Sequence, residues 1–155
     1  PFVIRGSQMF SLQHFVGPNK RFQLFEDGRI FYEDDFKVRD ENQNPIDHLC
    51  NTYPLFDRRL FDNGNFYGFT QEKDLFRGTT QAAEDLRNQG TPVYLNANID
   101  LCYPPLGVHL YQGDRFSLRE KLPAEVSTVE VAGFNDQAQV LINTNMGRAF
   151  LLTDQ

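Results

Sequence analysis

The stretch "RFQLFEDGRIFYE", residues 21–33, decides the fold class because it has the pattern of a β-hairpin. Residues that favour strands lie on both sides of Asp27-Gly28, a dipeptide that supplies the positive φ angles of a two-residue type I′ turn. This turn places Phe25 opposite Ile30. Both faces of the ribbon then carry apolar side chains, so we expect the core to cover one face and another element to cover the other.

The middle of the chain has the pattern of short helices. Residues 44–53 begin with an Asn-Pro pair suited to an N-cap and first helical position, followed by apolar residues at helical spacing. Residues 55–61 repeat that spacing more weakly. Residues 80–90, "TQAAEDLRNQG", begin with a capping threonine, contain good helix formers and end at a glycine. A short helical middle is therefore predicted over 45–90.

The C-terminal part of the chain, from residue 92, returns to a β pattern. Five short segments rich in strand formers alternate with Gly, Asn, Asp and Pro. Five strands joined by tight turns are typical of a small barrel of the SH3-like or OB-like kind. The predicted fold class is α+β leaning all-β, with an N-terminal hairpin sheet, a short helical middle and a C-terminal five-strand barrel-like unit.

The length of 155 residues predicts one domain, 1–155, with enough chain to bury a core. An alternative subdivision separates residues 1–91, the hairpin plus helical insert, from residues 92–155, the barrel-like unit. The letters show no period of the kind that signals internal repeats.

The bulk charge argues against several partners. The formal net charge is −6 and the pI about 5.0, so no basic field attracts a phosphate backbone, and nucleic acid is an unlikely partner. No run of about eighteen apolar residues exists to cross a membrane. We expect a cytoplasmic protein in which Pro1 follows a removed initiator Met; a secreted protein that has lost its signal peptide is the alternative.

Two cysteines, Cys50 and Cys102, lie far apart in the sequence. Two buried thiols are the expectation for a cytoplasmic chain, and one disulfide is the alternative in an oxidising compartment. No CxxC pair is present, so the sequence contains no motif for a zinc site or a dithiol redox site.

The acidic run "DENQN", residues 40–44, places oxygen-bearing side chains at alternate positions, as the first half of an EF-hand loop does. Pro45 then stands where that loop needs its glycine, and Asn51 stands where it needs a bidentate glutamate. We therefore expect a solvated connection and no bound metal. Glu33, Asp34 and Asp35 are interpreted in the same way, as charges that protect a strand edge.

The segments "LYQGDRFSL" and "GFNDQAQVLI" resemble part of the βγ-crystallin Greek key. Asn135 and Asp136 match the Asn/Asp pair of that family. Gln139 and Val140 stand where the family has hydroxyl residues, and Ser117 stands where it has a glycine. Calcium binding, which the full pattern would imply, is therefore not carried over, and a hairpin turn at the Asn-Asp pair explains the same residues.

Catalytic strings are absent from the sequence. "PFVIRG" resembles the opening of the tautomerase superfamily, in which an N-terminal proline such as Pro1 would act as a base, but the long helix that follows in that family has no counterpart here. The three histidines, His14, His48 and His109, match no metal motif. We expect His109 to be a partly exposed surface residue. No catalytic residue and no cofactor are predicted.

The aromatic content is the unusual feature, with 15 Phe, 6 Tyr and no Trp. This number of rings exceeds what one small barrel can bury, which favours burial against another subunit or protein. The candidate binding residues are aromatic side chains next to polar groups in predicted loops or strand ends: Phe66, Tyr67, Phe69, Tyr32, Phe36 and Tyr111.

Three functional hypotheses follow. The first is a non-enzymatic structural or protein-interaction module that binds a partner protein or its own copies, as a subunit of an assembly or as a viral structural or accessory protein. The second is a carbohydrate-binding module that uses loop aromatics. The third is a small hydrolase or isomerase whose His/Asp site, or Pro1, forms only in three dimensions.

Overall fold

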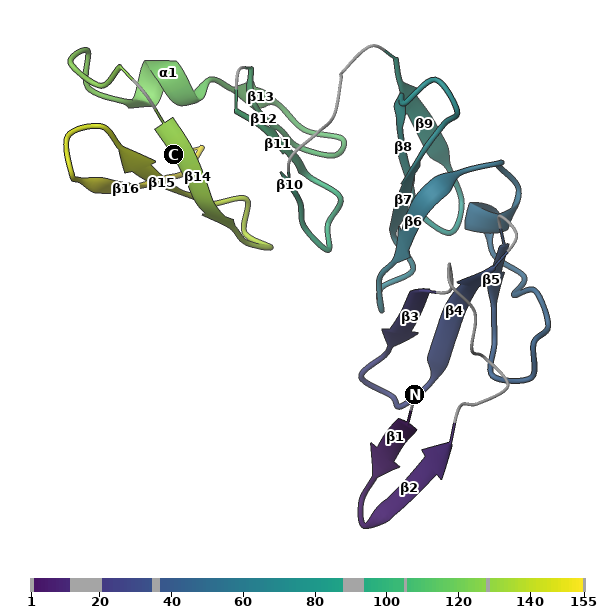
Figure 1. Ribbon diagram of the computed structural model, residues 1–155. Helices are drawn as coiled ribbons and strands as arrows, with labels where there is room; N and C mark the ends of the chain where they lie inside the picture. The colour runs from purple at the N-terminus through teal and green to yellow at the C-terminus, as the bar shows by residue number, and fades with distance from the viewer. Residues whose placement is uncertain are drawn as a thin grey trace.

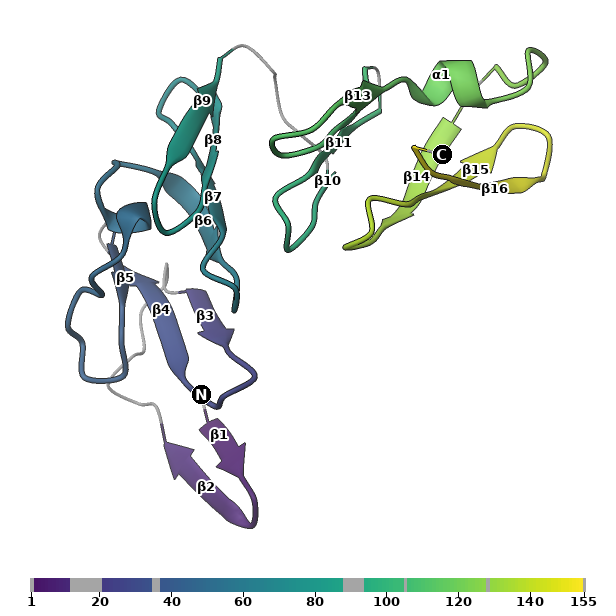
Figure 2. The ribbon, with the colours of Figure 1, turned by 180° about the vertical axis from the view of Figure 1, so that it is seen from behind.

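A computed structural model describes residues 2–11, 21–34, 37–87, 94–104, 106–127 and 129–154. The described chain is nearly all β, in antiparallel sheets that follow one another along the sequence (Figures 1 and 2). A two-stranded hairpin comes first, and four further sheets, which we call units 1 to 4, come after it.

The strands of the hairpin are β1 (Phe2–Arg5) and β2 (Gln8–Ser11). Unit 1 contains β3 (Arg21–Leu24), β4 (Ile30–Asp34) and β5 (Lys37–Arg39). Unit 2 contains β6 (Phe56–Leu60), β7 (Phe66–Phe69), β8 (Leu75–Gly78) and β9 (Ala83–Leu86). Unit 3 contains β10 (Tyr94–Leu95), β11 (Leu101–Tyr103), β12 (Gly107–His109) and β13 (Arg115–Phe116). Unit 4 contains β14 (Val129–Phe134), β15 (Val140–Thr144) and β16 (Ala149–Leu152).

Within each unit, every strand pairs only with its neighbours in sequence. Seven strands therefore occupy the region from residue 94 onward, in two separate sheets, and neither sheet closes on itself. The predicted five-strand barrel is wrong. Tight loops hold successive strands side by side in a meander, and no long connection returns a last strand to the edge of the first.

One loop geometry recurs in all four units. A five-residue loop, which we call the first loop, joins the first two strands of each unit. The N–H of its first residue donates to the carbonyl oxygen of its fifth residue. The donor and acceptor residues are Phe25 and Arg29 (2.9 Å), Phe61 and Asn65 (2.8 Å), Asn96 and Asp100 (3.4 Å), and Asn135 and Gln139 (3.2 Å). A second five-residue loop follows in each unit, and its first residue also donates its N–H to the carbonyl oxygen of its fifth. These second loops are residues 40–44, 70–74, 110–114 and 144–148.

The fourth residue of each first loop has a positive φ angle. Gly28 and Gly64 have φ angles of 86° and 87°, and Ile99 and Ala138 take φ angles of 55° and 57° in spite of their side chains. A turn followed by a left-handed residue is the common three-residue hairpin connection with a G1-type bulge. The hairpin predicted in unit 1 is confirmed, but its two-residue type I′ turn is wrong, because Leu24 rather than Phe25 is paired with Ile30.

The predicted helical middle is also wrong. Residues 56–60 form β6, residues 83–86 form β9, and of residues 44–53 only Leu49–Asn51 make a single 3₁₀ turn. Helix propensity is a weak preference that strand pairing overrides, and here β9 pairs along its whole length with β8. The α-helix of the described chain, α1 (Leu118–Lys121), lies instead in the region predicted to be β.

The buried apolar residues form two separate cores. One core lies between units 1 and 2 and contains Phe25, Phe31, Val38, Cys50, Leu55, Leu60 and Phe66. The other lies between units 3 and 4 and contains Cys102, Val108, Leu118, Leu122, Val126, Val131, Ala138, Val140, Ile142 and Leu152. The domain organisation predicted from the sequence stays a prediction.

The structure contains a repeat for which no period was found in the sequence. Units 1 and 2 contain matching strings, "LFEDGRIF" from Leu24 and "LFDNGNFY" from Leu60, which place the same loop between the same strands. The first loops of units 3 and 4 have the same geometry but different amino-acid sequences. No helix among the described residues is long and apolar enough to cross a membrane.

Candidate binding surface at the middle junction

Hydrogen bonds between first loops join each unit to the next. The second loop residue supplies one kind of bond: the N–H of Glu26 donates to Asp62 Oδ2 at 3.2 Å, and the N–H of Ala97 donates to Asp136 Oδ1 at 2.8 Å. These four residues occupy the same loop position in units 1 to 4. The junction between units 2 and 3 lacks this bond because Ala97 has no carboxylate.

The third loop residue supplies the other kind of bond. Asn63 Nδ2 donates to the carbonyl oxygen of Ala97 at 2.8 Å, and Asn98 Nδ2 donates to the carbonyl oxygen of Asp136 at 2.7 Å. Asn65 Nδ2 adds a bond to the same Ala97 oxygen at 3.0 Å. Figure 1 shows the first loops of units 2, 3 and 4 at the lower ends of their sheets, where these bonds connect them.

Polar contacts cross the middle junction, between units 2 and 3, and Leu75 of unit 2 and Ile99 and Leu101 of unit 3 are fully buried as well. Arg77 on β8 is buried, and its Nη1 donates to the carbonyl oxygens of Ile99 (2.7 Å) and His109 (3.2 Å). Its Nε pairs with Glu84 at 2.6 Å, and its guanidinium lies 5.4 Å from the centre of the Tyr111 ring. Two clusters of buried apolar residues flank this junction, one in units 1 and 2 and the other in units 3 and 4.

Three aromatic side chains and one arginine of unit 2 line this junction, and we call them the aromatic row: Phe61, Tyr67, Phe69 and Arg59. The ring centres of Phe61 and Tyr67 are 6.0 Å apart, and those of Tyr67 and Phe69 are 6.2 Å apart. The Arg59 guanidinium lies 5.2 Å from the centre of the Phe61 ring. All three rings are half-buried, so each presents part of its surface to solvent.

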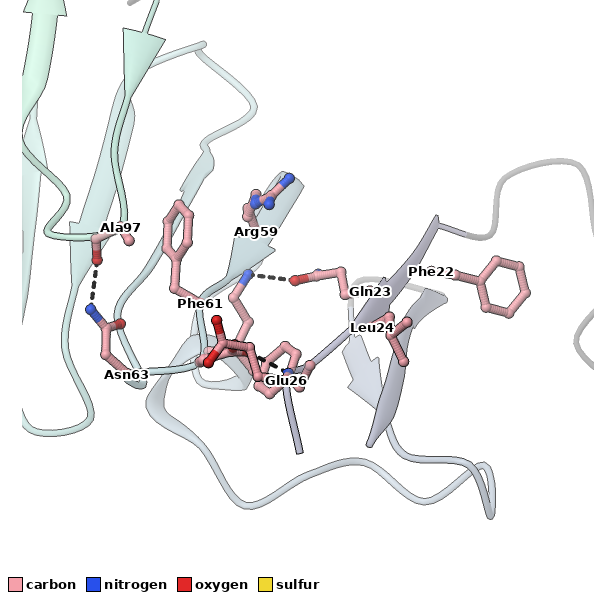
Figure 3. Close-up of a pocket in the computed structure, with 11 residues that line it drawn as sticks. Phe22, Gln23, Leu24, Glu26, Arg59, Phe61, Asn63 and Ala97 are labelled. Carbon is pink, nitrogen blue, oxygen red and sulfur yellow. Dashed lines mark hydrogen bonds between the residues drawn. The ribbon is translucent and has the colours of Figure 1, made fainter. Parts of the chain in front are cut away.

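A cavity lies at each end of the aromatic row. The first, of about 390 Å³, is lined by Arg59 and Phe61 together with residues of β3 and with Ala97 of unit 3. Figure 3 shows Phe61 and Arg59 on one side of this cavity, with Asn63 bonded to Ala97. The second cavity, of about 410 Å³, lies between Phe69 and Phe56, which pair across β6 and β7. The row is therefore a continuous apolar path between two hollows.

Of the charged residues around the row, some form ion pairs and Arg59 does not. Arg21 and Asp57 form an exposed ion pair at 2.6 Å. Arg59 makes no hydrogen bond or ion pair with the described residues beyond its contact with the Phe61 ring. Burial raises the pKa of the Tyr67 hydroxyl, so this group is neutral at physiological pH and can donate a hydrogen bond.

The structure divides the predicted binding residues. Tyr67 and Phe69 lie in the aromatic row, and Tyr111 lies under Arg77 at the same junction. Phe66 and Tyr32 are buried, so their rings are not available on the surface. Phe36 lies outside the described residues.

The sequence reasoning missed Phe61 and Arg59. Both lie within the helix predicted at 55–61, and the sequence analysis gives neither of them a binding role. The repeated string "LFDNG" is the signal that could have identified them, because it places Phe61 at the start of a hairpin loop and Arg59 on the strand before it.

Of the two described histidines, His109 is buried and His48 is half-buried. His48 Nδ1 accepts the N–H of Cys50 at 3.0 Å, and its Nε2 lies 2.9 Å from the carbonyl oxygen of Gly64, so the ring is neutral with its proton on Nε2. His109 is also buried, so its predicted surface exposure is wrong. Pro1 and His14 lie outside the described residues.

Lowering the pH is expected to destabilise the fold through these histidines. Burial lowers the pKa of His48 and of His109 below the ordinary value of 6.5. The contribution of the neutral histidines to stability is complete above pH 6.5 and decreases as the pH falls below it. At lower pH these histidines bind protons more tightly in the unfolded chain than in the folded chain. Urea unfolding at pH 7.5 and pH 5.5 should show a lower free energy of unfolding at pH 5.5.

The matched control is His48→Asn, whose side-chain oxygen can still accept the Cys50 N–H. This variant should lose less stability than the natural chain between the two pH values. Equal losses in the two proteins would show that His48 does not contribute.

Contacts within the acidic loop and burial of the two cysteines describe these predicted features. Asp40 Oδ1 accepts the N–H groups of Asn42 (2.9 Å) and Asn44 (3.0 Å), which makes it a loop cap. No group of three or more metal-ligating side chains occurs among the described residues. Cys50 and Cys102 are free and buried, and burial raises their thiol pKa values to about 12 and about 11.

Comparisons with protein-family models, with curated proteins and with solved structures gave no significant match.

Proposed function

We propose that this chain is a non-enzymatic protein-binding module, and that the aromatic row takes up a segment of a partner protein. The observation that carries the proposal is the aromatic row, where three half-buried rings and an arginine without a carboxylate partner connect two cavities. Tyrosine and arginine dominate the energetics of protein interfaces, especially next to pockets that exclude water.

The chemistry of the row indicates the kind of segment. The path between the cavities is apolar, and it ends at the guanidinium of Arg59 and at Lys73, which lines the second cavity. An extended segment with apolar side chains in the middle and a carboxylate at one or both ends complements this surface. The rest of the chain, with a net charge of −6, disfavours segments that are acidic throughout.

The relative orientation of the rings favours a protein ligand over a sugar. The planes of Phe61 and Tyr67 are tilted by 43°, and those of Tyr67 and Phe69 by 76°. Sugar rings stack on flat aromatic faces, whereas interlocking apolar side chains fit between tilted rings. The carbohydrate-binding alternative therefore has less support, and the enzyme alternative has no group of side chains among the described residues to support it.

A display library of random peptides, selected on the full chain, tests this proposal. We expect enriched peptides with apolar residues flanked by an acidic residue. Tyr67→Ser should weaken the binding of a selected peptide by about thirtyfold, which corresponds to about 2 kcal/mol for an interface residue of this kind. Arg59→Ser should weaken peptides that carry the acidic residue more than peptides that lack it.

The matched control is Tyr103→Ser, which removes another half-buried tyrosine ring, on β11, that lines neither cavity. Melting curves should show that all three variants fold. Selected peptides that bind the Tyr67→Ser and Tyr103→Ser variants equally well, or enrichment of no peptide at all, would contradict the proposal.

A further inference from the structure

The first loop of unit 2 contains the only Asn-Gly pair of the sequence, Asn63-Gly64. Asparagine is chemically labile, and most so before glycine, because glycine has no Cβ to obstruct attack by its main-chain nitrogen on the asparagine side chain. The third and fourth residues of the other first loops are Asp27-Gly28, Asn98-Ile99 and Gln137-Ala138. Among the four first loops, that of unit 2 alone combines an asparagine with a glycine.

The fold requires the glycine of this pair. Gly64 has a φ angle of 87°, which a residue with a side chain rarely adopts. A Cβ atom at this position would also lie 2.6 Å from Cγ2 of Thr80. The labile pair is therefore a consequence of the loop geometry, and it cannot be removed by a substitution at Gly64 without strain.

Hydrogen bonds hold the reacting groups of this pair in the folded chain. Asn63 Nδ2 donates to the carbonyl oxygen of Ala97 at 2.8 Å, and Asn63 Oδ1 accepts the N–H of Asn65 at 2.9 Å (Figure 3). The N–H of Gly64 donates to the carbonyl oxygen of Phe61 at 2.9 Å. Attack requires the Asn63 side chain to rotate toward the Gly64 nitrogen and that nitrogen to lose its proton, so these bonds must break first.

The loop contact of the middle junction can open by a small movement. The side chains of Asn63 and Asn65 both donate to one acceptor, the carbonyl oxygen of Ala97. The other kind of loop-to-loop bond is missing here because Ala97 has no carboxylate. Displacement of Ala97 therefore releases both side chains, while Arg77 can keep its bonds to Ile99 and His109.

We propose that Asn63 is a modification site at which opening of the middle junction is recorded as a permanent chemical change. When the junction is open, the Gly64 nitrogen forms a bond to Cγ of Asn63 and the bond from Cγ to Nδ2 breaks. The proton of the Gly64 nitrogen leaves with Nδ2 as ammonia, which gives a cyclic succinimide. Water then opens the ring by adding its OH to either carbonyl carbon and its remaining hydrogen to the Gly64 nitrogen. The product is aspartate or isoaspartate at position 63.

Neither product can rebuild the original contact. Both carry a carboxylate, which has no N–H to donate and is repelled by the carbonyl oxygen of Ala97. Isoaspartate also carries the main chain through Cγ, which lengthens the loop and displaces Asn65, whose carbonyl oxygen accepts the N–H of Phe61. Modification therefore leaves the loop contact between units 2 and 3 open.

Peptide mapping by mass spectrometry tests the site on the full chain incubated at pH 7.5, with and without urea. The peptide that contains Asn63 should gain the mass difference between OH and NH2, at least about tenfold more slowly in the folded chain than in urea, because the folded chain must open first. Asn98 is the matched internal control, since its amide makes the same kind of bond, at 2.7 Å, but precedes Ile99. Equal rates at Asn63 with and without urea, or modification of Asn98 as fast as that of Asn63, would overturn the proposal.

Two variants test the role of the junction. Asn65→Ser removes one of the two bonds to Ala97 and should accelerate the modification of Asn63 in the folded chain, measured relative to the rate of the same variant in urea. Asn42→Ser, at an exposed asparagine of unit 1, should not change that rate. An unchanged rate in Asn65→Ser would show that the junction does not control the reaction.

The modified chain itself tests the consequence. Its additional negative charge allows separation from the unmodified chain by ion exchange, and it should unfold at a lower urea concentration. Equal unfolding midpoints of the two forms would overturn the claim that modification keeps the contact open. These measurements do not involve a peptide ligand, so their outcome is independent of binding by the aromatic row.

Discussion

Replacing Arg58 with alanine is expected to lower the free energy of unfolding by about 3 to 5 kcal/mol, the range found when one partner of a buried ion pair is removed. The Arg58 side chain on β6 is completely buried, and its Nε lies 3.7 Å from Oε1 of Glu33 on β4. Its Nη1 also donates to the carbonyl oxygens of Cys50 (2.9 Å) and Tyr53 (3.4 Å). The arginine therefore connects unit 1, unit 2 and the segment between them.

The cost arises because the neighbours of Arg58 remain buried when it is removed. Burial raises the pKa of Glu33 while Arg58 opposes that rise, so Glu33 without Arg58 would be a largely buried acid that has lost its main counter-charge. The two carbonyl oxygens would also lose their donor. Urea denaturation with fluorescence or circular dichroism measures this loss directly.

Two control variants test whether the loss in Arg58→Ala comes from the buried ion pair. Arg59→Ala, at the exposed neighbouring position, should change the stability by less than about 0.5 kcal/mol, as surface substitutions usually do. Glu33→Leu combined with Arg58→Met should be more stable than Arg58→Ala alone, because Arg58 Nε and Nη2 and Glu33 Oε2 already lack hydrogen-bond partners. Equal stabilities of Arg58→Ala and Arg59→Ala would contradict the buried connection.

Gly107→Ala is the second substitution with a large expected effect, a loss of more than about 3 kcal/mol, because it combines backbone strain with a main-chain clash. Gly107 begins β12 with a φ angle of 117°, a region that residues with side chains rarely adopt. A Cβ atom there would lie 2.1 Å from the carbonyl oxygen of Phe116, on the paired strand β13. The strand would have to move, and Val108 in the core would move with it.

Gly147→Ala is the matched control for Gly107. Gly147 also has a positive φ angle, 67°, but no atom lies within 4 Å of the position that its Cβ would take. Its substitution should cost only the left-handed backbone conformation, about 1 to 2 kcal/mol. Thermal unfolding of both variants should separate the two effects, and a Gly107→Ala protein as stable as Gly147→Ala would show that β12 and β13 are not packed as described.

The sequence predicted strands where local chemistry decides the structure and failed where pairing decides it. The Asp27-Gly28 signal is local, so the hairpin of unit 1 was predictable. Residues 83–86 have the letters of a helix, yet they form β9 because β8 offers an edge to pair with, and no single-sequence propensity contains that information. The left-handed conformations of Ile99 and Ala138 hid the loops of units 3 and 4, since turn signals depend on glycine at that position.

The candidate site was predictable in part for the same reason. Tyr67 and Phe69 were selected from the aromatic string that contains them, and they do lie at the surface of the middle junction. Phe66, one residue earlier, points to the opposite face of the sheet and is buried, because side chains alternate along a strand. The contribution of Ala97 to the first cavity comes from a different unit and could not be inferred without the repeat.

Amide hydrogen exchange, measured by NMR on the full chain, tests the central claim that loop-to-loop bonds join repeated units. The N–H groups of Glu26 and Ala97 lie in loops, where amides ordinarily exchange fast, but they donate to Asp62 and Asp136 of the next unit. Both should exchange markedly more slowly than the neighbouring amide of Asp27, and Asp136→Ala should accelerate Ala97 alone. Exchange of the Glu26 and Ala97 amides at the rate of a free loop would contradict the repeat.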